Sequence, residues 1–228
     1  MGDDPGALTG AKDLSTKVKL AQAVVDSLGN DQIRDLIKDR AKVVLEDAFS
    51  DEWLTRVPFV GAIFALGAVG VGISDRLLVR KLILCMSTIS EIAASARREM
   101  VERLEADPAY KRRVGEHLIE LLDRVDSHRK PAMVALVFVA FAKREINATM
   151  LHRLLNAIER IPTAEIDGVR AWAALKPGER GRLTDPESLQ AYGNAGLSGV
   201  LSTHGGLAYP PKKTGEMFIA LALDLKSR

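Results

Sequence analysis

Residues 57–74 read VPFVGAIFALGAVGVGIS, and this stretch decides how the rest of the chain is interpreted. It holds no charged side chain, although 27% of the residues in the whole chain are charged. A helix that crosses the hydrocarbon core of a bilayer needs about 20 apolar residues, with a workable minimum of about 17. The stretch therefore meets the length requirement narrowly, and its flanks and small residues must decide between lipid and protein core.

Both the flanks and the small residues favour lipid. Trp53 and Arg56 precede the stretch and Arg76 follows it, as expected of side chains that meet lipid headgroups. Each glycine costs a water-soluble helix roughly 1 kcal/mol relative to alanine, whereas membrane helices use small residues to pack closely. We therefore expect a membrane helix whose pore-facing and packing residues are Phe59, Gly61, Ala65, Ala68 and Gly72.

A buried hairpin in a water-soluble helical bundle, beginning at Pro58, is the alternative, because no second clear span is present. A single span per chain cannot enclose a channel, so a pore would need several subunits around an axis. The membrane interpretation therefore predicts a homo-oligomer, for instance a tetramer.

The composition predicts an all-α fold. The chain has 228 residues, 47% of them hydrophobic but only 5% aromatic, which favours a helical bundle over a sandwich or barrel. Its net charge of +2 is too small to imply nucleic acid or anionic lipid as a partner. We expect N-terminal amphipathic helices over residues 1–50, a helical membrane-associated or channel domain over 51–162, and a C-terminal soluble domain over 163–228.

Helical spacing and capping residues predict the main elements. Apolar residues recur at helical spacing over 75–96, which predicts one continuous helix. Asp107 followed by Pro108 predicts a helix start, and Asn147 predicts another, with that helix stopping before Pro162.

After residue 176 the sequence becomes rich in Gly and Pro. It predicts a helix over 185–194, short strands over 200–202 and 207–209, and a helix from residue 214. Helix, hairpin and helix in this order predict a small winged-helix-like (α+β) appendage.

No catalytic machinery is evident, so we expect a protein that is not an enzyme and uses no cofactor. The sequence lacks a GxSxG elbow and a phosphate-binding glycine loop. His117 and Glu120 are three residues apart, but exposed helix charges explain them better than a metal site. Cys85 lies in the apolar run LILCM, where a buried thiol is expected rather than a nucleophile.

The C-terminal region mixes cations with aromatic rings, the combination that holds single-stranded nucleic acid. The candidate ligand- or DNA-binding residues are Arg170, Trp172, Lys176, Arg180, Arg182, Tyr192, His204, Tyr209, Lys212 and Lys213. The alternative is an ordinary polar domain in which Trp and Tyr anchor a small core and nearby carboxylates offset the cations.

Three segments carry a resemblance to a known family: RVPFVGAIFALGAVGVGISDRLLVRKLIL, EADPAYKRRVGEHLIELLDRVD and INATMLHRLLNAIERI. In outline they resemble the effector subunit of Hailong-type bacterial anti-phage defence. The resemblance implies an oligomeric effector in the bacterial inner membrane, with most of the chain cytoplasmic. It also implies an ion-conducting pore, to which the segment around 59–73 would contribute. A single-stranded DNA oligomer, made by a partner nucleotidyltransferase and bound by the region after Pro162, would hold that pore shut.

Two functions remain open. The first is this ligand-gated membrane effector. The second is a soluble helical regulator or adaptor that binds DNA or protein through its C-terminal winged-helix-like region, although the helix DPESLQAYGN has few of the cations that a DNA-reading helix carries.

Overall fold

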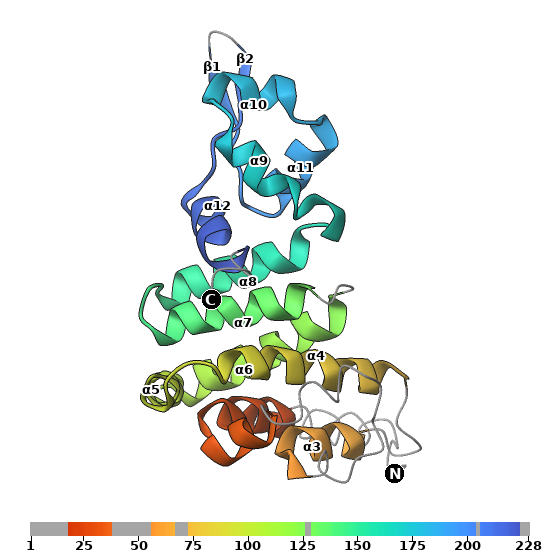
Figure 1. The fold of residues 1–228 in the computed structure, drawn as a ribbon, viewed down its shortest axis with the longest axis vertical. Coiled ribbons are helices and arrows are strands. Elements are labelled where there is room, and N and C mark those ends of the chain that lie inside the picture. The colour runs from red at the N-terminus through yellow and green to blue at the C-terminus, as the bar shows by residue number, and fades with distance from the viewer. Residues whose placement is uncertain (1–17, 38–55, 67–72, 126–128, 204–205, 224–228) are drawn as a thin grey trace, which may run out of the picture. The chain divides into compact units, whose positions relative to one another are not determined.

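The computed structural model describes residues 18–37, 56–66, 73–125, 129–203 and 206–223. Most of these residues are helical, which confirms the all-α prediction in its coarse form (Figure 1). The chain divides into two compact units, Met1–Arg124 and Val125–Arg228. The predicted functional division at residues 50 and 162 stays a prediction.

The N-terminal unit is built from packed helices. Residues 18–29 and 31–37 are helical. The helices that follow are α3 (Pro58–Leu66), α4 (Ile73–Ile89), α5 (Ala94–Glu105) and α6 (Pro108–Arg124). Helix α6 contacts both α4 and α5, and α3 contacts α4. Their apolar faces form the core of this unit, which includes Leu20, Val24, Val79, Leu82, Met100, Leu104, Leu118 and Leu121.

The stretch 57–74 is not one helix in the part of the chain that the structure describes. Helix α3 covers nine of its residues, and α4 begins at Ile73. Nowhere in the described ranges is a helix both long enough and apolar enough to cross a bilayer. The predicted apolar membrane-type helix is therefore not found there.

The structure describes only two of the five residues predicted for the pore in full, and these two differ in burial. Phe59 is fully buried on α3, whereas Gly61 on the same helix is exposed. The side chain of Ala65 and the whole of Ala68 and Gly72 lie outside the described residues.

The prediction of one continuous helix over 75–96 is wrong, and Arg97 supplies the physical reason. Helix α4 ends at Ile89 and α5 begins at Ala94. The buried guanidinium of Arg97 donates hydrogen bonds to the carbonyl oxygens of Ile92 at 2.7 Å and Ser90 at 3.4 Å. Carbonyls at the end of a helix lack intrahelical donors, so this side chain stabilises the break between the two helices.

The predicted helix starts at Asp107 and Asn147 are confirmed. The Asp107 carboxylate accepts hydrogen bonds from the backbone N–H groups of Ala109 and Tyr110 at 2.9 and 3.1 Å. The Asn147 side chain accepts from the backbone N–H of Met150 at 2.9 Å. Each bond satisfies a donor that has no partner inside its own helix.

The C-terminal unit contains longer helices, then shorter helices and a hairpin. The longer helices are α7 (Arg129–Ala142) and α8 (Ala148–Arg160), which pack against each other. The 3₁₀ helix η2 (Thr163–Glu165) follows, and then α9 (Gly168–Ala174), α10 (Pro177–Leu183) and α11 (Pro186–Asn194). The chain closes with strands β1 (Leu201–Thr203) and β2 (Gly206–Ala208), helix α12 (Lys213–Met217) and the π-helix η3 (Phe218–Ala222).

Strands β1 and β2 form an antiparallel hairpin in which Leu201 pairs with Ala208 and Ser202 with Leu207. The predicted strands at 200–202 and 207–209 are thus confirmed to within one residue. Helix α12 packs on α8, and η3 packs on α7. The predicted order of helix, hairpin and helix is present, with a sheet of only two short strands.

Candidate ligand-binding site

Helix α11 is positioned by its own first turn. The Asp185 carboxylate accepts hydrogen bonds from the backbone N–H groups of Glu187 at 2.9 Å and Ser188 at 3.1 Å. Pro186 occupies the first helical position, where its lack of an N–H costs nothing. The predicted helix over 185–194 is therefore confirmed, and its start is set by local sequence.

The two faces of α11 differ in polarity. Leu189 and Tyr192 are buried in the unit, whereas Gln190 and Asn194 are exposed. Gln190 and Asn194 are four residues apart, so they lie on the same side of the helix. This side presents two amide groups, each with donors and an acceptor.

Backbone pairing holds the hairpin beside α11. Gly196 has a φ of 75°, the left-handed conformation in which glycine commonly ends a helix. The chain then pairs with the segment that returns from the hairpin: Gly199 N–H donates to the Pro210 carbonyl at 2.9 Å, and Ser198 bridges Pro211. The position of the hairpin relative to α11 is thereby set by the main chain.

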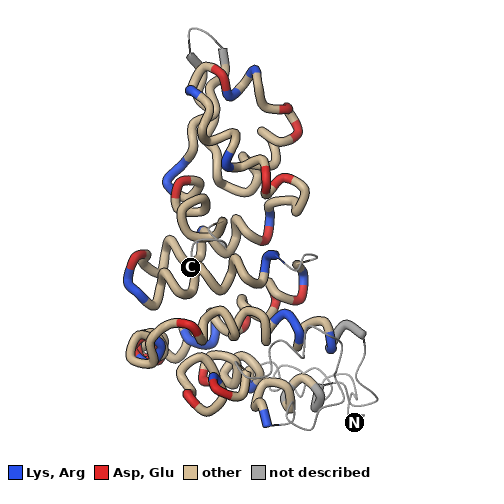
Figure 2. Tube along the Cα trace, in the orientation of Figure 1, with Lys and Arg blue, Asp and Glu red and all other residues tan. Residues whose placement is uncertain are grey.

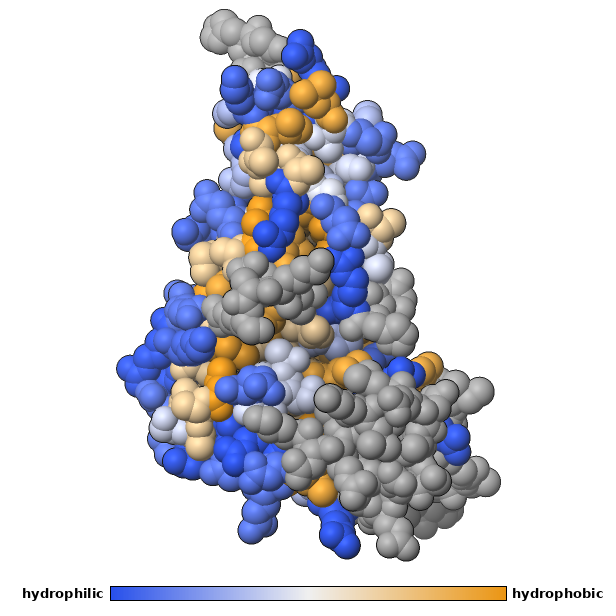
Figure 3. Space-filling view, viewed as in Figure 1, coloured by the Kyte–Doolittle hydropathy of each residue, from blue (hydrophilic) through white to orange (hydrophobic). Residues whose placement is uncertain are grey.

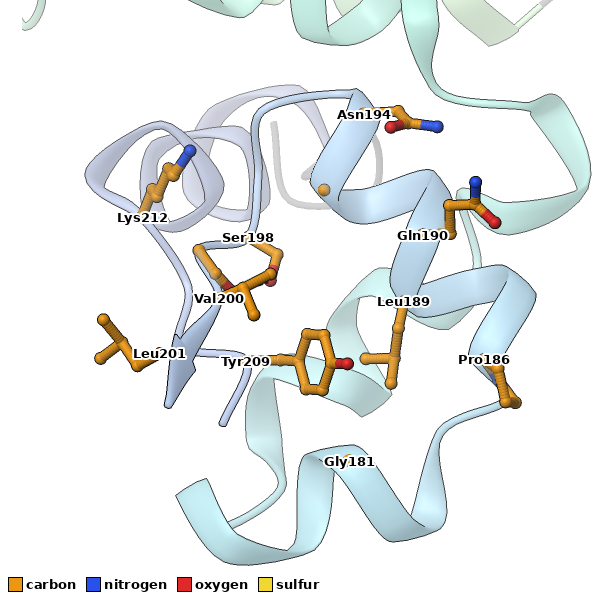
Figure 4. A pocket seen from close by; sticks show the side chains of 12 residues that line it. Gly181, Pro186, Leu189, Gln190, Asn194, Ser198, Val200, Leu201, Tyr209 and Lys212 are labelled. Carbon is orange, nitrogen blue, oxygen red and sulfur yellow. The ribbon is translucent and has the colours of Figure 1, made fainter. Parts of the chain in front are cut away.

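A groove of about 710 Å³ lies between α11 and the hairpin (Figure 4). We call it the hairpin groove; its main lining residues are Leu189, Gln190, Asn194, Val200, Leu201 and Tyr209. Lys212, just before α12, also lines it. Its volume lies within the range of small-molecule sites, about 300–1,000 Å³.

The groove combines an aromatic and apolar interior with polar edges. In Figure 4 the ring of Tyr209 points toward Leu189, while Gln190 and Asn194 extend from α11 away from the ring. A Cβ at Gly181 of α10 would lie 3.5 Å from the Tyr209 ring, so this ring rests against α10. The arrangement offers a ring for stacking and two amides for hydrogen bonding.

Large apolar side chains remain exposed around the hairpin. Val200 and Leu201 are 59% and 56% exposed, and Leu207 and Leu183 of the neighbouring strand and helix are also exposed. Figure 3 shows apolar side chains reaching the surface at this end of the unit. Single exposed apolar residues are ordinary, but a group of them beside a groove is typical of a binding surface.

Trp172 and Tyr192 do not belong to this surface. Both are 1% exposed, and their ring centroids lie 5.0 Å apart. A Cβ at Gly168 would lie 2.5 Å from the Tyr192 hydroxyl, so the α9 backbone closes over this ring. Burial raises the pKa of Tyr192. These rings were candidates for stacking on bases. They instead form a small core, as in the alternative of an ordinary polar domain anchored by Trp and Tyr.

Arg180 is half-buried and is held by contacts within the unit. Its guanidinium lies 5.9 Å from the centroid of the Trp172 ring. It donates hydrogen bonds to the carbonyl oxygens of Trp172 at 3.3 Å and Ala173 at 3.0 Å. These carbonyls lie in the last turn of α9, so Arg180 joins α9 to α10, a structural role.

The other predicted residues are spread over the unit. Arg170, Lys176 and Arg182 are exposed, and the structure does not bring them to the hairpin groove. His204 lies outside the described residues. Of the ten candidates, Tyr209 and Lys212 line the groove.

Lys213, the remaining candidate, lies 3.5 Å from Glu216. Sequence reasoning missed Gln190 and Asn194, although their spacing on a capped helix before a hairpin could have suggested a shared polar face.

Neither a metal site nor an activated thiol is available in the described ranges. Groups of three or more His, Cys, Asp or Glu side chains that could hold a metal ion do not occur there. Cys85 is buried, and burial raises the pKa of its thiol to about 12. The thiolate is the reactive form, so Cys85 is inert at neutral pH.

The lining of the hairpin groove offers stacking on Tyr209, apolar contact with Val200 and Leu201, and hydrogen bonding by the amides of Gln190 and Asn194. Comparisons of this chain with protein-family models, with curated proteins and with solved structures give no match.

Proposed function

We propose that this chain is a regulatory protein whose C-terminal unit binds a short single-stranded nucleic acid in the hairpin groove. The N-terminal unit would carry the response to that binding. The observation that supports this most is the groove itself, which places an aromatic ring, exposed apolar side chains and two amides around about 710 Å³.

The groove lining suits unstacked bases. A base has two apolar faces, and stacking one base on an aromatic side chain contributes about 1–3 kcal/mol. Val200 and Leu201 would cover the remaining apolar surface of the ligand and become less exposed themselves. Gln190 and Asn194 carry the amide groups that pair with adenine edges in protein–DNA complexes.

The same features argue against duplex DNA. A recognition helix enters the major groove and needs cations around it to approach the phosphates. Helix α11 contains no Lys or Arg, and Asp185 and Glu187 stand at its start. These carboxylates would face the phosphates of a duplex, whereas a single strand can place its bases in the groove and its phosphates elsewhere.

The test is fluorescence anisotropy of the full chain with a labelled single-stranded 12-mer and with a 12-base-pair duplex. We expect the single strand to bind more tightly. Tyr209→Ala should weaken single-strand binding by about 5- to 150-fold, the loss of one stacking contact. Tyr209→Phe keeps the ring and is the matched control, with affinity within about threefold of the wild type. Equal affinity of Tyr209→Ala and Tyr209→Phe would refute the role of the groove.

A pore-forming effector of anti-phage defence is the second candidate. It is supported by the charge-free stretch 57–74 and by the resemblance of three segments to the Hailong effector subunit. The predicted homo-oligomer, the inner-membrane location and the partner nucleotidyltransferase all belong to this candidate. Co-sedimentation of the full chain with lipid vesicles tests it, and a chain that stays monomeric and in the supernatant would count against it.

A further inference from the structure

A second concave site, which shares Lys212 with the hairpin groove, lies between α8 and the start of α12. It has a volume of about 430 Å³, and its polar lining residues are Arg153, Asn156, Arg160, Lys212, Lys213 and Thr214. We call it the basic pocket. Ala195 and Gly196 complete its wall. Among the described residues, neither an aromatic nor a large apolar side chain lines it, so its lining suits charge rather than a ring.

Helix α8 supplies half of the basic pocket from one face. Arg153, Asn156 and Arg160 are spaced by three and four residues, so they follow one side of the helix. All three are exposed, because the opposite side of α8 carries the buried residues Leu151, Leu154, Leu155 and Ile158. The apolar face thus orients the polar face toward the pocket.

The other half is held by the backbone. Lys212 N–H donates to the Leu197 carbonyl at 2.8 Å, which anchors the segment before α12 next to the turn that follows α11. Gly215 approaches the Leu197 backbone so closely that a side chain there would collide with it. Thr214 is buried beside it. Lys212 and Lys213 therefore extend from a backbone that is fixed at several points.

The described lining of the basic pocket is positive. Its residues include four cations, Arg153, Arg160, Lys212 and Lys213, and neither Asp nor Glu. Lys213 has a carboxylate neighbour, Glu216, at 3.5 Å. Within the described part of the chain, no ion pair involves Arg153, Arg160 or Lys212. Figure 2 shows the blue of Lys212 and Lys213 on the segment that leads into α12. Four cations in one hollow repel each other, so the site is suited to a ligand of several negative charges.

We infer that the basic pocket binds a ligand with at least two neighbouring phosphate groups. Arginine matches phosphate oxygens with paired, nearly parallel N–H donors, and lysine adds a point charge. Asn156 and Thr214 add neutral hydrogen-bonding groups to the same wall. The phosphates belong either to a nucleic-acid backbone or to a free nucleoside polyphosphate. The inference goes beyond the hairpin groove, because it requires no base and stands even if the groove binds none.

The experiment is isothermal titration calorimetry of the full chain with sodium tripolyphosphate, which carries phosphates but no base. The wild type should bind it, and Arg153→Gln/Arg160→Gln should bind it roughly tenfold or more weakly, because two charge-assisted donors are lost. The matched control is Arg112→Gln/Lys143→Gln, which removes the same charge from exposed positions that do not line the pocket and should stay within about twofold. Citrate, with similar charge but no phosphate, should bind more weakly than tripolyphosphate.

Several outcomes would overturn the inference: no binding by the wild type, equal losses in both double variants, or equal affinity for citrate. Displacement assays then identify the source of the phosphates. If ATP displaces tripolyphosphate and a single-stranded 12-mer does not, the ligand is a free nucleotide. If the 12-mer displaces it as well, the pocket holds backbone phosphates. Either result supports the pocket. Binding of the 12-mer to Tyr209→Ala reports separately on the groove.

Discussion

The two units of this chain use their cations differently. In the N-terminal unit two cations with little exposure are paired: Arg97 is bonded to Asp31, and Lys111 lies 2.6 Å from Asp26 and 2.8 Å from Glu105. In the C-terminal unit the described lining of the basic pocket gathers four cations in one hollow and holds no carboxylate, although Lys213 lies 3.5 Å from Glu216. Paired cations stabilise the first unit. In the second unit Arg153, Arg160 and Lys212 have no ion pair among the described residues, and the proposed anion site rests on their charge.

The difference cannot be seen in composition, because both halves mix acids and bases. It appears only when burial and partner are known for each cation. Arg97 is 1% exposed and has an ion-pair partner and carbonyl acceptors, whereas Arg153 and Arg160 are exposed. A buried charge requires such partners, and an exposed one does not. The role of a cation therefore follows from its burial and its partners, and not from the number of Lys and Arg residues in the unit.

The largest expected effect is the loss of Arg97. Arg97→Ala removes the ion pair with Asp31 and leaves the carbonyls of Ser90 and Ile92 without their donor. We expect it to lower the free energy of unfolding by about 3 kcal/mol, at the low end for breaking a buried charge pair because Asp31 itself is partly exposed. Urea denaturation followed by circular dichroism measures this.

Arg98→Ala is the matched control for that measurement. Arg98 binds the other oxygen of the same Asp31 carboxylate at 2.9 Å, but its side chain is 55% exposed. An exposed ion pair contributes at most about 1 kcal/mol. If the two alanine variants lost equal stability, burial would not be what distinguishes these cations.

A smaller effect is expected where α6 packs closely against the helix over residues 18–29. At Gly115 of α6, a Cβ would lie 2.6 Å from the Ala21 carbonyl oxygen, so Gly115→Ala would push two backbones apart. Overpacking costs about 1–3 kcal/mol, while the helix gains about 1 kcal/mol on replacing glycine. We expect a net loss of up to about 2 kcal/mol in the same denaturation experiment.

Gly178 in α10 of the C-terminal unit gives the opposite expectation. A Cβ there would meet nothing within 4 Å. Gly178→Ala should therefore gain part of the roughly 1 kcal/mol of helix propensity, with no clash to offset it. A loss of stability in both glycine variants would show that the close contact at Gly115 is not the cause.

Local sequence predicts the helix starts well. The prediction failed where a helix boundary depends on contacts between residues far apart in the sequence. The caps at Asp107, Asn147 and Asp185 need only the next few residues, so each could be predicted. The break after Ile89 could not, because it depends on an arginine that folds back and on Asp31, 66 residues away in sequence. A periodic apolar pattern continues across such a break.

The prediction of the candidate site was incomplete for a related reason. Trp172 and Tyr209 both stand within four residues of a Lys in the sequence, yet Trp172 is core and Tyr209 lines the groove. An aromatic residue can serve either role, and only packing decides. Arg153 and Arg160 were missed because the polar face of an amphipathic helix has the same pattern whether it meets solvent or a second element.

The smallest expected effect concerns the basic pocket itself. Arg153→Gln/Arg160→Gln should change the free energy of unfolding by no more than about 0.5 kcal/mol, because exposed cations without an ion pair contribute little to stability. Lys111→Gln, which removes a cation with two carboxylate partners, should cost more, about 1 kcal/mol.

Thermal unfolding with and without tripolyphosphate completes this last comparison. A ligand that binds only the folded state stabilises it, by about 2.7 kcal/mol at a concentration one hundred times its Kd. Tripolyphosphate should therefore raise the Tm of the wild type and of Lys111→Gln, but raise that of Arg153→Gln/Arg160→Gln much less. If the double arginine variant instead lost more than about 1 kcal/mol without ligand, its arginines would be structural like Arg97, and the two units would use their cations in the same way.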